Sequence, residues 1–300
     1  MPKIGRDAYG YVYVYAAAAL WSTIGVAAKL GMAAGGSPLG LALVRTAVAG
    51  FAAVVLSLTS RHARRIALSV PVALLGLLVV APFHYVYMVA IERLGVALAV
   101  VLLYTAPIWV LAARAAFSRS VRRSDAAAVA MAVAGVTLIY LPSSSAGEAI
   151  WDIAWGLASG LLYAALIVGS RAVLEKVDFL KGRLTPAAAA ISVQGWAAPS
   201  LALAIALSGA GVGRSDVVSG LYLGLVSSIV AYYLFYEGLS RVPPERASVA
   251  ATLEPLLGVF WGVLLLGEAM GPSRALGAAL VILSQLFISL AGQDSSRVPS

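Results

Sequence analysis

Three side chains that can carry charge lie within long apolar stretches of this 300-residue chain: Arg45, His84 and Glu254. A guanidinium can hold a carboxylate through two parallel hydrogen bonds, an imidazole can take up or release a proton, and a carboxyl group can pair with an ammonium group. Charged and titratable groups are costly in apolar surroundings. Each of the three is therefore a candidate for binding a solute or carrying a proton.

Each of these residues also has a structural interpretation, and the sequence leaves both open. Arg45 could pair with a helix terminus or reach toward the membrane surface, His84 could be a hydrogen-bonded core residue, and Glu254 could serve structure or gating. His84 follows Pro82, and a proline inside a helix frees a carbonyl group and kinks the chain. The residues expected to couple or gate a conformational change are His84, Glu254, Pro82, Pro107 and Pro255.

Aromatic and small polar side chains accompany the charged ones at similar depths. Trp21 and Tyr163 occupy corresponding positions in the first and sixth apolar runs, which suits opposite walls of one cavity. Serine hydroxyls and a glutamine carboxamide could bind the polar end of a solute. For any single aromatic residue, packing or lipid contact remains an alternative. The expected cavity residues are Trp21, Arg45, His84, Tyr87, Tyr104, Trp109, Tyr163, Gln194, Ser227, Ser228 and Tyr232.

The elements that must position these residues are transmembrane helices. Mean hydropathy is +0.94, and 11% of the residues are charged, whereas a soluble domain carries about a quarter. Apolar runs of about 20 residues recur, which is the length that crosses about 30 Å of hydrocarbon. The runs are continuous and not alternating, so they predict helices and not barrel strands. We expect ten spans, at about 11–30, 38–58, 68–91, 95–117, 124–142, 152–173, 186–208, 217–239, 245–266 and 272–291.

The basic residues predict how these spans are oriented. With the N-terminus placed inside, sixteen of the 21 Lys and Arg residues fall on inside segments, four fall outside and Arg45 lies within a span. Cytoplasmic loops carry the excess of basic residues, so both termini are expected in the cytoplasm. The net charge of +8 then reflects anchoring of loops on anionic lipid. The sequence has no stripe of basic residues interleaved with aromatic residues, so we do not expect nucleic-acid binding.

The second half of the chain resembles the first. Arg93 and Pro107 match Arg241 and Pro255 at a separation of 148 positions, and similar seven-residue segments begin at 47 and 192. Five spans per half is an odd number, so the second half must enter the membrane from the opposite side. The expected divisions are a cytoplasmic N-terminus (1–10), a first repeat (11–142), an extracytoplasmic linker (143–151), a second repeat (152–292) and a disordered cytoplasmic tail (293–300).

An inverted repeat favours a carrier whose solute site lies near the midplane between the halves. Two halves that rock between mirror-image states would open that site to each side of the membrane in turn. We therefore expect alternating access in an all-α membrane protein. A pseudo-dimer within one chain also makes a functional monomer plausible.

Short motifs in the second half carry a resemblance to a known family. Ala-Ser at 247–248, Leu-Glu-Pro at 253–255 and Leu-Gly-Glu at 266–268 are similar to the EamA-type proteins of the drug/metabolite transporter superfamily. The first half has the degenerate counterpart Leu-Tyr-Thr-Ala-Pro at 103–107 and lacks the Leu-Gly-Glu element. The stretch 93–107 most resembles the amino-acid exporters of that superfamily. The resemblance implies a carrier of the bacterial inner membrane that exports aromatic, other neutral and methionine-like amino acids.

Other functions are disfavoured or left open. The chain has no cysteine and two histidines without paired ligand spacing, so we expect no metal site and no cofactor. An enzyme would need convergent acids or a nucleophile beside a base, and a channel would need rings of charge; neither pattern is present. A carrier of another small cargo, such as a cationic drug, a nucleotide sugar or another metabolite, remains the alternative.

Overall fold

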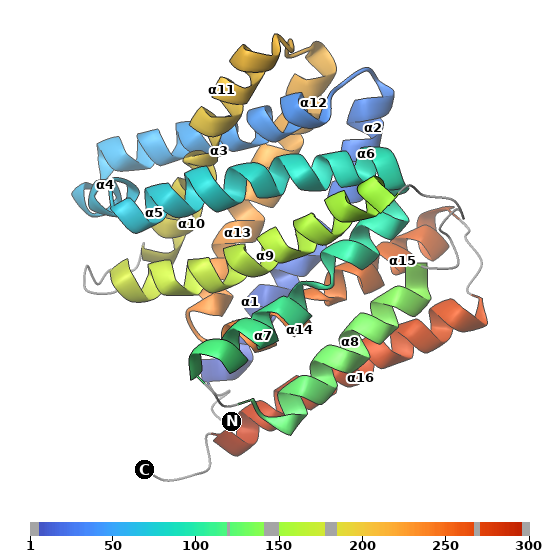
Figure 1. The fold of residues 1–300 in the computed structure, drawn as a ribbon. Helices are drawn as coiled ribbons and strands as arrows, with labels where there is room; N and C mark the ends of the chain where they lie inside the picture. Colours follow the sequence, from blue (N-terminus) through green and yellow to red (C-terminus); the bar gives the residue numbers. More distant parts are fainter. Residues whose placement is uncertain (1–5, 119–120, 141–149, 178–184, 267–270, 296–300) are drawn as a thin grey trace.

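The computed structural model describes residues 6–118, 121–140, 150–177, 185–266 and 271–295, and these residues form helices joined by short turns. Figure 1 shows the helices gathered into one bundle. The helices are α1 (Arg6–Trp21), α2 (Ile24–Ala33), α3 (Pro38–Thr59), α4 (Arg61–Ala67), α5 (Val70–Leu75), α6 (Ala81–Leu103), α7 (Ala106–Ser118), α8 (Arg123–Tyr140), α9 (Ile150–Val177), α10 (Thr185–Gly195), α11 (Ala197–Ser208), α12 (Arg214–Tyr222), α13 (Ala231–Leu239), α14 (Pro244–Ala251), α15 (Leu253–Leu266) and α16 (Pro272–Ser295). Two π-helical segments, η1 (Gly76–Val80) and η4 (Leu223–Val230), complete the described elements.

Six helical stretches among the described residues are long and apolar enough to cross a membrane, and Pro272–Phe287 is a shorter apolar helix. The six stretches are Ala8–Ala33, Pro38–Thr59, Val70–Phe117, Trp151–Val177, Thr185–Ser208 and Arg214–Leu239. Val70–Phe117 contains 48 residues, which as one straight helix would measure about 72 Å, more than twice the hydrocarbon thickness. Gly95 inside it has φ 73°, a left-handed conformation that bends the chain there.

The expected helix ranges correspond to helical segments, but several of the helices are interrupted. The first range breaks at Ser22–Thr23, the fourth at Tyr104–Thr105, the seventh at Trp196 and the ninth at Thr252. The π-helical segments interrupt the third and eighth ranges. A π-turn inserts one residue into an α-helix, and such insertions often occur at functional sites. The short helix α4 lies outside the expected ranges.

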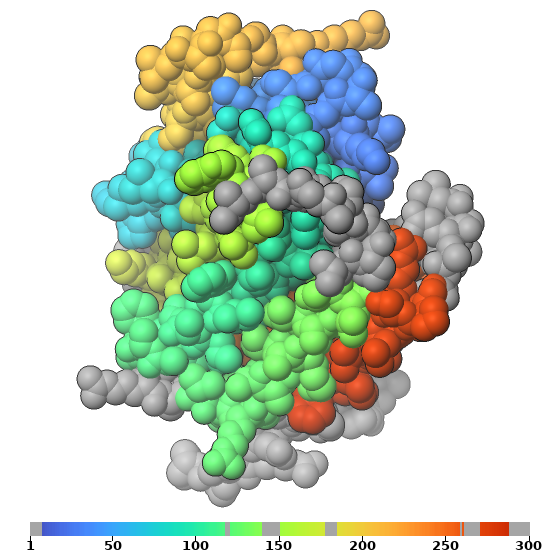
Figure 2. All heavy atoms as spheres, turned by 45° about the vertical axis from the view of Figure 1, so that its right-hand side comes forward, coloured from blue at the N-terminus to red at the C-terminus, as the bar shows by residue number. Residues whose placement is uncertain are grey.

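Helices far apart in the sequence pack side by side. α3 packs on α10, α1 on α13 and α6 on α9. α8 and α16 form a pair at one side of the bundle, as Figures 1 and 2 show in green and red. Each of these contacts joins a helix from the first half of the chain to one from the second half.

Glycines allow the closest of these contacts. A Cβ atom built on Gly195 of α10 would lie 2.7 Å from the Cα of Gly50 in α3, and one on Gly277 of α16 would lie 2.6 Å from the carbonyl oxygen of Gly135 in α8. These are backbone-to-backbone contacts that a larger residue would force apart. Gly220 of α12 and Gly224 of η4 lie against Val44 and Val48 of α3.

Candidate functional site

Arg45 lies in the middle of the bundle and is 1% exposed. It projects from α3 toward η4, where its Nε donates a hydrogen bond of 3.0 Å to the hydroxyl of Ser228. Gly224 permits this approach, because a Cβ atom there would lie 3.0 Å from the Arg45 carbonyl oxygen. A fully buried guanidinium is costly unless several acceptors surround it, and its side chain offers five N–H donors.

His84 and Gln194 form a second polar contact at the same level. The Nε2 of His84 in α6 donates to the side-chain oxygen of Gln194 in α10 at 2.6 Å, and both residues are buried. His84 lies two residues after Pro82, which directly follows the π-helical segment η1. Proline removes a backbone donor, and the wider π-turn before it accommodates the missing bond.

Tyr104 and Glu254 form the third contact and join the two halves. The Tyr104 hydroxyl lies 2.7 Å from the Glu254 carboxyl oxygen and 2.9 Å from the carbonyl oxygen of Ala251. One hydroxyl carries one hydrogen, so it donates to only one of these acceptors at a time. Tyr104 stands at the break between α6 and α7, and Glu254 stands in the first turn of α15. Pro107 and Pro255 lie in the first turns of α7 and α15, next to these two residues.

Aromatic rings fill the space between the polar contacts. The ring centroid of Trp21 lies 6.3 Å from that of Tyr163 and 4.9 Å from that of Tyr232, and both contacts are edge-on. The indole nitrogen of Trp21 donates a hydrogen bond of 3.1 Å to the Ser227 carbonyl oxygen. Tyr163 also lies within 6.3 Å of Tyr104. The structure thus brings the expected opposite walls into contact.

Two phenylalanines missed by the sequence analysis belong to the same group. Phe83 stacks on Tyr163 at 5.5 Å and on Tyr87 at 6.1 Å, and Phe235 lies 5.2 Å from Trp21. Phe83 adjoins His84 in the sequence and Phe235 lies three positions after Tyr232, the spacing of neighbours on one helix face. That proximity is the only sequence signal that could have identified them.

Ten of the eleven expected cavity residues therefore meet in one buried group, which we call the central cluster. Its members are Trp21, Arg45, His84, Tyr87, Tyr104, Tyr163, Gln194, Ser227, Ser228 and Tyr232, together with Glu254, Phe83 and Phe235. Trp109 does not belong to the central cluster. It is 41% exposed, and its indole nitrogen donates a hydrogen bond to the hydroxyl of Thr105, one turn earlier in the chain.

Several polar atoms of the central cluster have no hydrogen-bond partner among the described residues. They include the Nδ1 of His84, the hydroxyl of Tyr163 and the hydroxyl of Ser227. Buried polar atoms are usually paired, so unpaired ones need an explanation. Groups of opposite charge type are also present, since Arg45 and Glu254 both belong to the central cluster while each bonds to a neutral partner.

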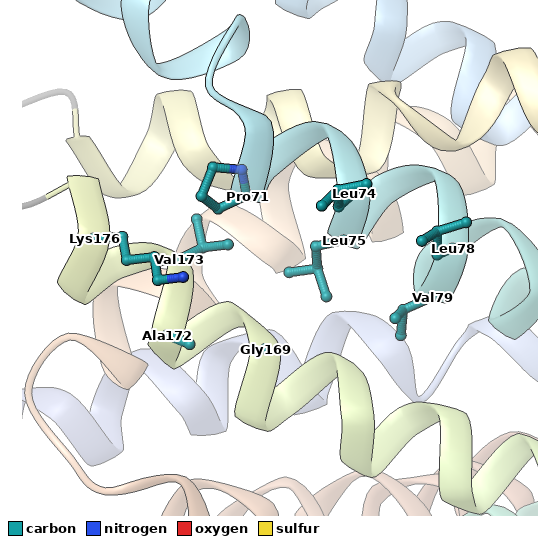
Figure 3. Close-up of a pocket in the computed structure, with 9 residues that line it drawn as sticks. All are labelled: Pro71, Leu74, Leu75, Leu78, Val79, Gly169, Ala172, Val173 and Lys176. Carbon is teal, nitrogen blue, oxygen red and sulfur yellow. The ribbon is translucent and has the colours of Figure 1, made fainter.

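Two cavities lie away from the central cluster. One, of about 280 Å³, is an apolar groove between the α5–η1 segment and α9, with Lys176 as its one charged lining residue (Figure 3). The other, of about 740 Å³, is lined by residues of α7, α9, the α13–α14 turn and the start of α14, and by Arg122. We call it the arginine cavity, because its lining includes Arg114, Arg122, Arg171, Arg241 and Arg246.

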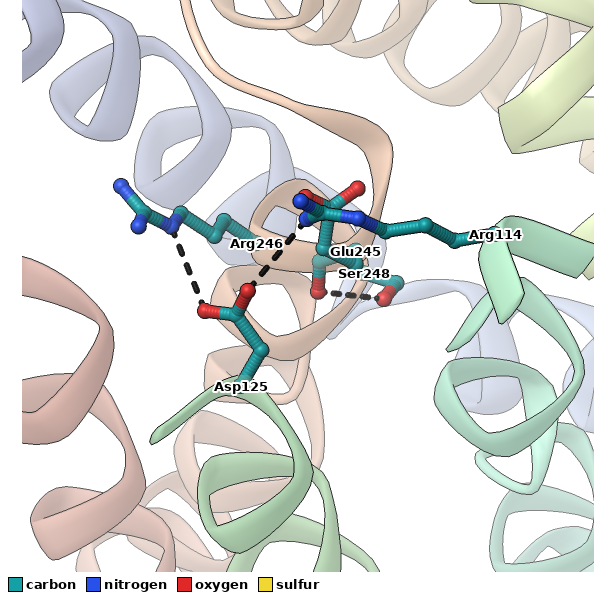
Figure 4. A network of polar contacts seen from close by, with 5 residues as sticks. All are labelled: Arg114, Asp125, Glu245, Arg246 and Ser248. Carbon is teal, nitrogen blue, oxygen red and sulfur yellow. Dashed lines mark hydrogen bonds and ion pairs between the residues drawn. The ribbon is translucent and has the colours of Figure 1, made fainter. Parts of the chain in front are cut away.

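Ion pairs join three helices beside the arginine cavity. Arg114 of α7 contacts both Asp125 of α8, at 3.3 Å, and Glu245 of α14. Asp125 also lies 3.5 Å from Arg246 of α14, as Figure 4 shows. Asp125 and Glu245 are buried, so their charges depend on these arginines for compensation. A further ion pair joins Glu237 to Arg241 at 2.6 Å.

Comparisons with known proteins agree on one family. The model of the EamA-like transporter family matches the chain twice, over residues 8–141 and 150–290. A transporter of Bacillus subtilis, YwfM, is 28% identical over 93% of both chains. A probable amino-acid metabolite efflux pump of Salmonella typhimurium is 26% identical over 59% of this chain and 60% of its own length. A crystal structure with 18% identity superposes with a TM-score of 0.76 over 95% of this chain and 98% of the other, which shows a shared fold.

Proposed function

The chain belongs to the EamA-like transporter family, and from that premise we propose that it exports neutral and aromatic amino acids, including methionine-like ones, by alternating access. Members of this family are transporters, so the expectation of a transporter and not an enzyme is confirmed. The cargo, the direction and the site form our proposal. The observation that carries it is the pair of opposite charges in the central cluster.

Arg45 and Glu254 together suit a zwitterion. Arg45 is 1% exposed and bonds to Ser228, whereas Glu254 is 7% exposed and accepts from Tyr104. No ion pair joins them within the part of the chain that the structure describes. A solute carboxylate beside Arg45 and a solute ammonium beside Glu254 would each replace a neutral partner with an opposite charge. A neutral cargo without charges would gain less from this arrangement.

The rings and the unpaired atoms suit the rest of an amino acid. Trp21, Phe83, Tyr163 and Phe235 provide apolar faces that could pack on an aromatic or thioether side chain. The unpaired Tyr163 hydroxyl could accept or donate one further hydrogen bond. A set of mostly apolar side chains with a few polar groups is typical of small-molecule sites.

We propose ten spans in two inverted halves, and several observations support this. The family model matches once in each half. α6 ends at Leu103 and α14 at Ala251, and these positions differ by 148, the same separation that relates Pro107 to Pro255. When η1 is shifted by 148 positions along the sequence, it falls within η4. The bend at Gly95 divides the 48-residue stretch into two lengths that each suit one crossing.

The proposed location is the bacterial inner membrane with both termini in the cytoplasm. The excess of basic residues on one set of loops supports the orientation. The curated relatives from Bacillus subtilis and Salmonella typhimurium support a bacterial setting. In Figure 1, α4 and the end of α7 lie at the end of the bundle opposite the α2–α3 turn. In this proposal that end faces the cytoplasm.

Transport by purified protein in liposomes tests the cargo. We expect flux of radiolabelled phenylalanine, tryptophan and methionine, and weak flux of the corresponding amides, which lack the carboxylate for Arg45. Equal flux of acids and amides would remove the role of Arg45. Absence of amino-acid flux alongside flux of a cationic drug or a nucleotide sugar would overturn the substrate class and favour another cargo.

A further inference from the structure

We propose that the arginine cavity is a second solute site, which captures the carboxylate group of the cargo before it reaches the central cluster. This inference rests on the proposed function. The cavity measures about 740 Å³, which is within the usual range of small-molecule sites. It is separate from the central cluster, since none of its lining residues is a member of that group.

The charges of the cavity favour an anion. Its lining holds five arginines and two glutamates, Glu175 and Glu245. Two further carboxylates, Asp125 and Glu237, lie behind the lining and pair with arginines of it. The described lining therefore carries more guanidinium groups than carboxylates. A solute carboxylate suits such a lining, because arginine binds carboxylates through paired hydrogen bonds.

The remainder of the lining favours an apolar body attached to that carboxylate. Aliphatic surface comes from Val110 and Ala113 of α7, Val168 of α9, and Val242 and Pro243 of the α13–α14 turn. A lining that combines apolar and charged groups matches a neutral or aromatic amino acid better than a small inorganic anion. The groove of Figure 3 lacks this combination, since Lys176 is its one charged residue.

The cavity lies next to the central cluster along two helices. On α9, Val168 follows Tyr163 by five residues, or about 7.5 Å of helix. Arg241, in the turn after α13, follows Tyr232 of that helix by nine residues. Nearby, the Ser170 hydroxyl donates to the Tyr236 hydroxyl at 2.7 Å, and Arg171 donates to the Leu239 carbonyl oxygen at 2.7 Å. These contacts join α9 to α13 along the same stretch, so a solute in the cavity would have them to pass.

Equilibrium binding of two compounds tests the proposal without transport. 3-Phenylpropanoate carries a carboxylate on an aromatic body and has no ammonium group, and 3-phenylpropanamide is its uncharged counterpart. Titration calorimetry on the detergent-solubilised protein should show binding of the acid at least about tenfold tighter than the amide, as a charge-assisted hydrogen bond provides. Arg122→Gln and Arg171→Gln should each weaken binding of the acid about tenfold and leave the amide unchanged.

Arg64→Gln is the matched control, because Arg64 is an exposed arginine of α4 that does not line the cavity. It should bind the acid as the wild type does. Equal affinity for acid and amide, or unchanged affinity in both cavity variants, overturns the proposal. Two results together would assign the arginines to a lipid headgroup: the acid no longer binds in phosphatidylcholine nanodiscs, and the variants lose affinity for phosphatidylglycerol. That outcome also overturns the proposal. A wild type that binds the acid at these arginines but moves no amino acid retains the capture site and contradicts the proposed function.

Discussion

In the proposed function, single buried groups decide what the central cluster can bind. Arg45, His84 and Glu254 come from α3, α6 and α15, and each contacts a neutral side chain and not another charge. A buried charge held by neutral hydrogen bonds is less well compensated than an ion pair. These residues are therefore poised to gain from an incoming solute or proton.

Replacement of Glu254 separates coupling from binding. Glu254→Gln keeps an acceptor for Tyr104 but cannot take up a proton, so we expect flux that no longer responds to a pH gradient across the liposome membrane. Glu92→Gln, at an exposed glutamate of α6, should retain the wild-type response. If Glu254→Gln still follows the gradient, coupling lies elsewhere, with His84 as the next candidate. A wild type without any response is a facilitator.

The Tyr163 hydroxyl should matter for binding and not for folding. Because it has no partner among the described residues, Tyr163→Phe removes no hydrogen bond from the protein. We expect an unchanged Tm in detergent and a loss of amino-acid affinity of roughly two- to tenfold, the worth of one hydrogen bond. Tyr236→Phe is the control, since it breaks the bond to Ser170 and should lower Tm. A lower Tm for Tyr163→Phe would assign that hydroxyl to structure.

Residue type predicted the polar members of the central cluster better than the aromatic ones. Arg45 and Gln194 were identifiable because such side chains are rare inside apolar helices. Trp109 was wrongly expected beside them, because helices that are apolar on every side give no signal of which face turns inward. Phe83 and Phe235 were missed for the same reason.

Helices and their interruptions set the positions of these groups. Apolar length predicted where helices occur, since a stretch of about 20 apolar residues has few other stable forms in lipid. The apolar pattern did not predict the π-helical segments, which lie in close contact with other helices. Gly76 of η1 shows this: a Cβ atom there would lie 2.4 Å from Trp196 and 2.6 Å from the Val193 carbonyl oxygen of α10.

The α3–α10 contact should tolerate no side chain. Gly195→Ala would place its Cβ atom 2.7 Å from the Gly50 Cα, and backbone cannot shift cheaply. We expect a loss of about 1–3 kcal/mol in stability, measured as a lower Tm in detergent. Gly211→Ala is the control, because a Cβ atom there would meet nothing within 4 Å. Equal Tm values for the two variants would show that the helices are farther apart than described.

The Ser170–Tyr236 bond between α9 and α13 should restrict access to the central cluster. The chain has no cysteine, so Ser227→Cys introduces a single thiol at a buried site. In this background Ser170→Ala should speed labelling by a water-soluble thiol reagent about fivefold, since one hydrogen bond is worth about 1 kcal/mol. Ser57→Ala, on α3 and bonded only within its own helix, should have no effect. Equal labelling rates in all three would place the access route elsewhere.

At the scale of the whole molecule, polar contacts join helices at both ends. At one end Asp216 of α12 accepts from the backbone N–H of Ser37 at 2.7 Å and of Gly213 at 2.8 Å. At the other end Arg114 joins Asp125 to Glu245. The central cluster between them is buried. The repeat itself was visible in the sequence, whereas these end contacts were not, because the charged residues of each set lie on helices that meet only after folding.

Labelling from each side of the membrane tests the proposed orientation. Arg61→Cys, at the start of α4, and Gly211→Cys, between α11 and α12, should lie on opposite sides. In intact cells an impermeant thiol reagent should label Gly211→Cys, and Arg61→Cys should react only after the cells are opened. The reverse pattern would invert the orientation, and labelling of both from outside would contradict the span assignment between them.

The two glycine crossings have a mechanical consequence. Gly50 with Gly195 and Gly135 with Gly277 are points where backbones touch without intervening side chains. Helices that meet at such a point can rotate about it while the distance between them stays fixed. Pro38, twelve residues from Gly50, lies about 18 Å along α3 from the crossing, so a tilt of roughly 10° would displace that end by about 3 Å. The crossings would then act as fulcrums, with small tilts at the centre producing the largest displacements at the membrane surfaces.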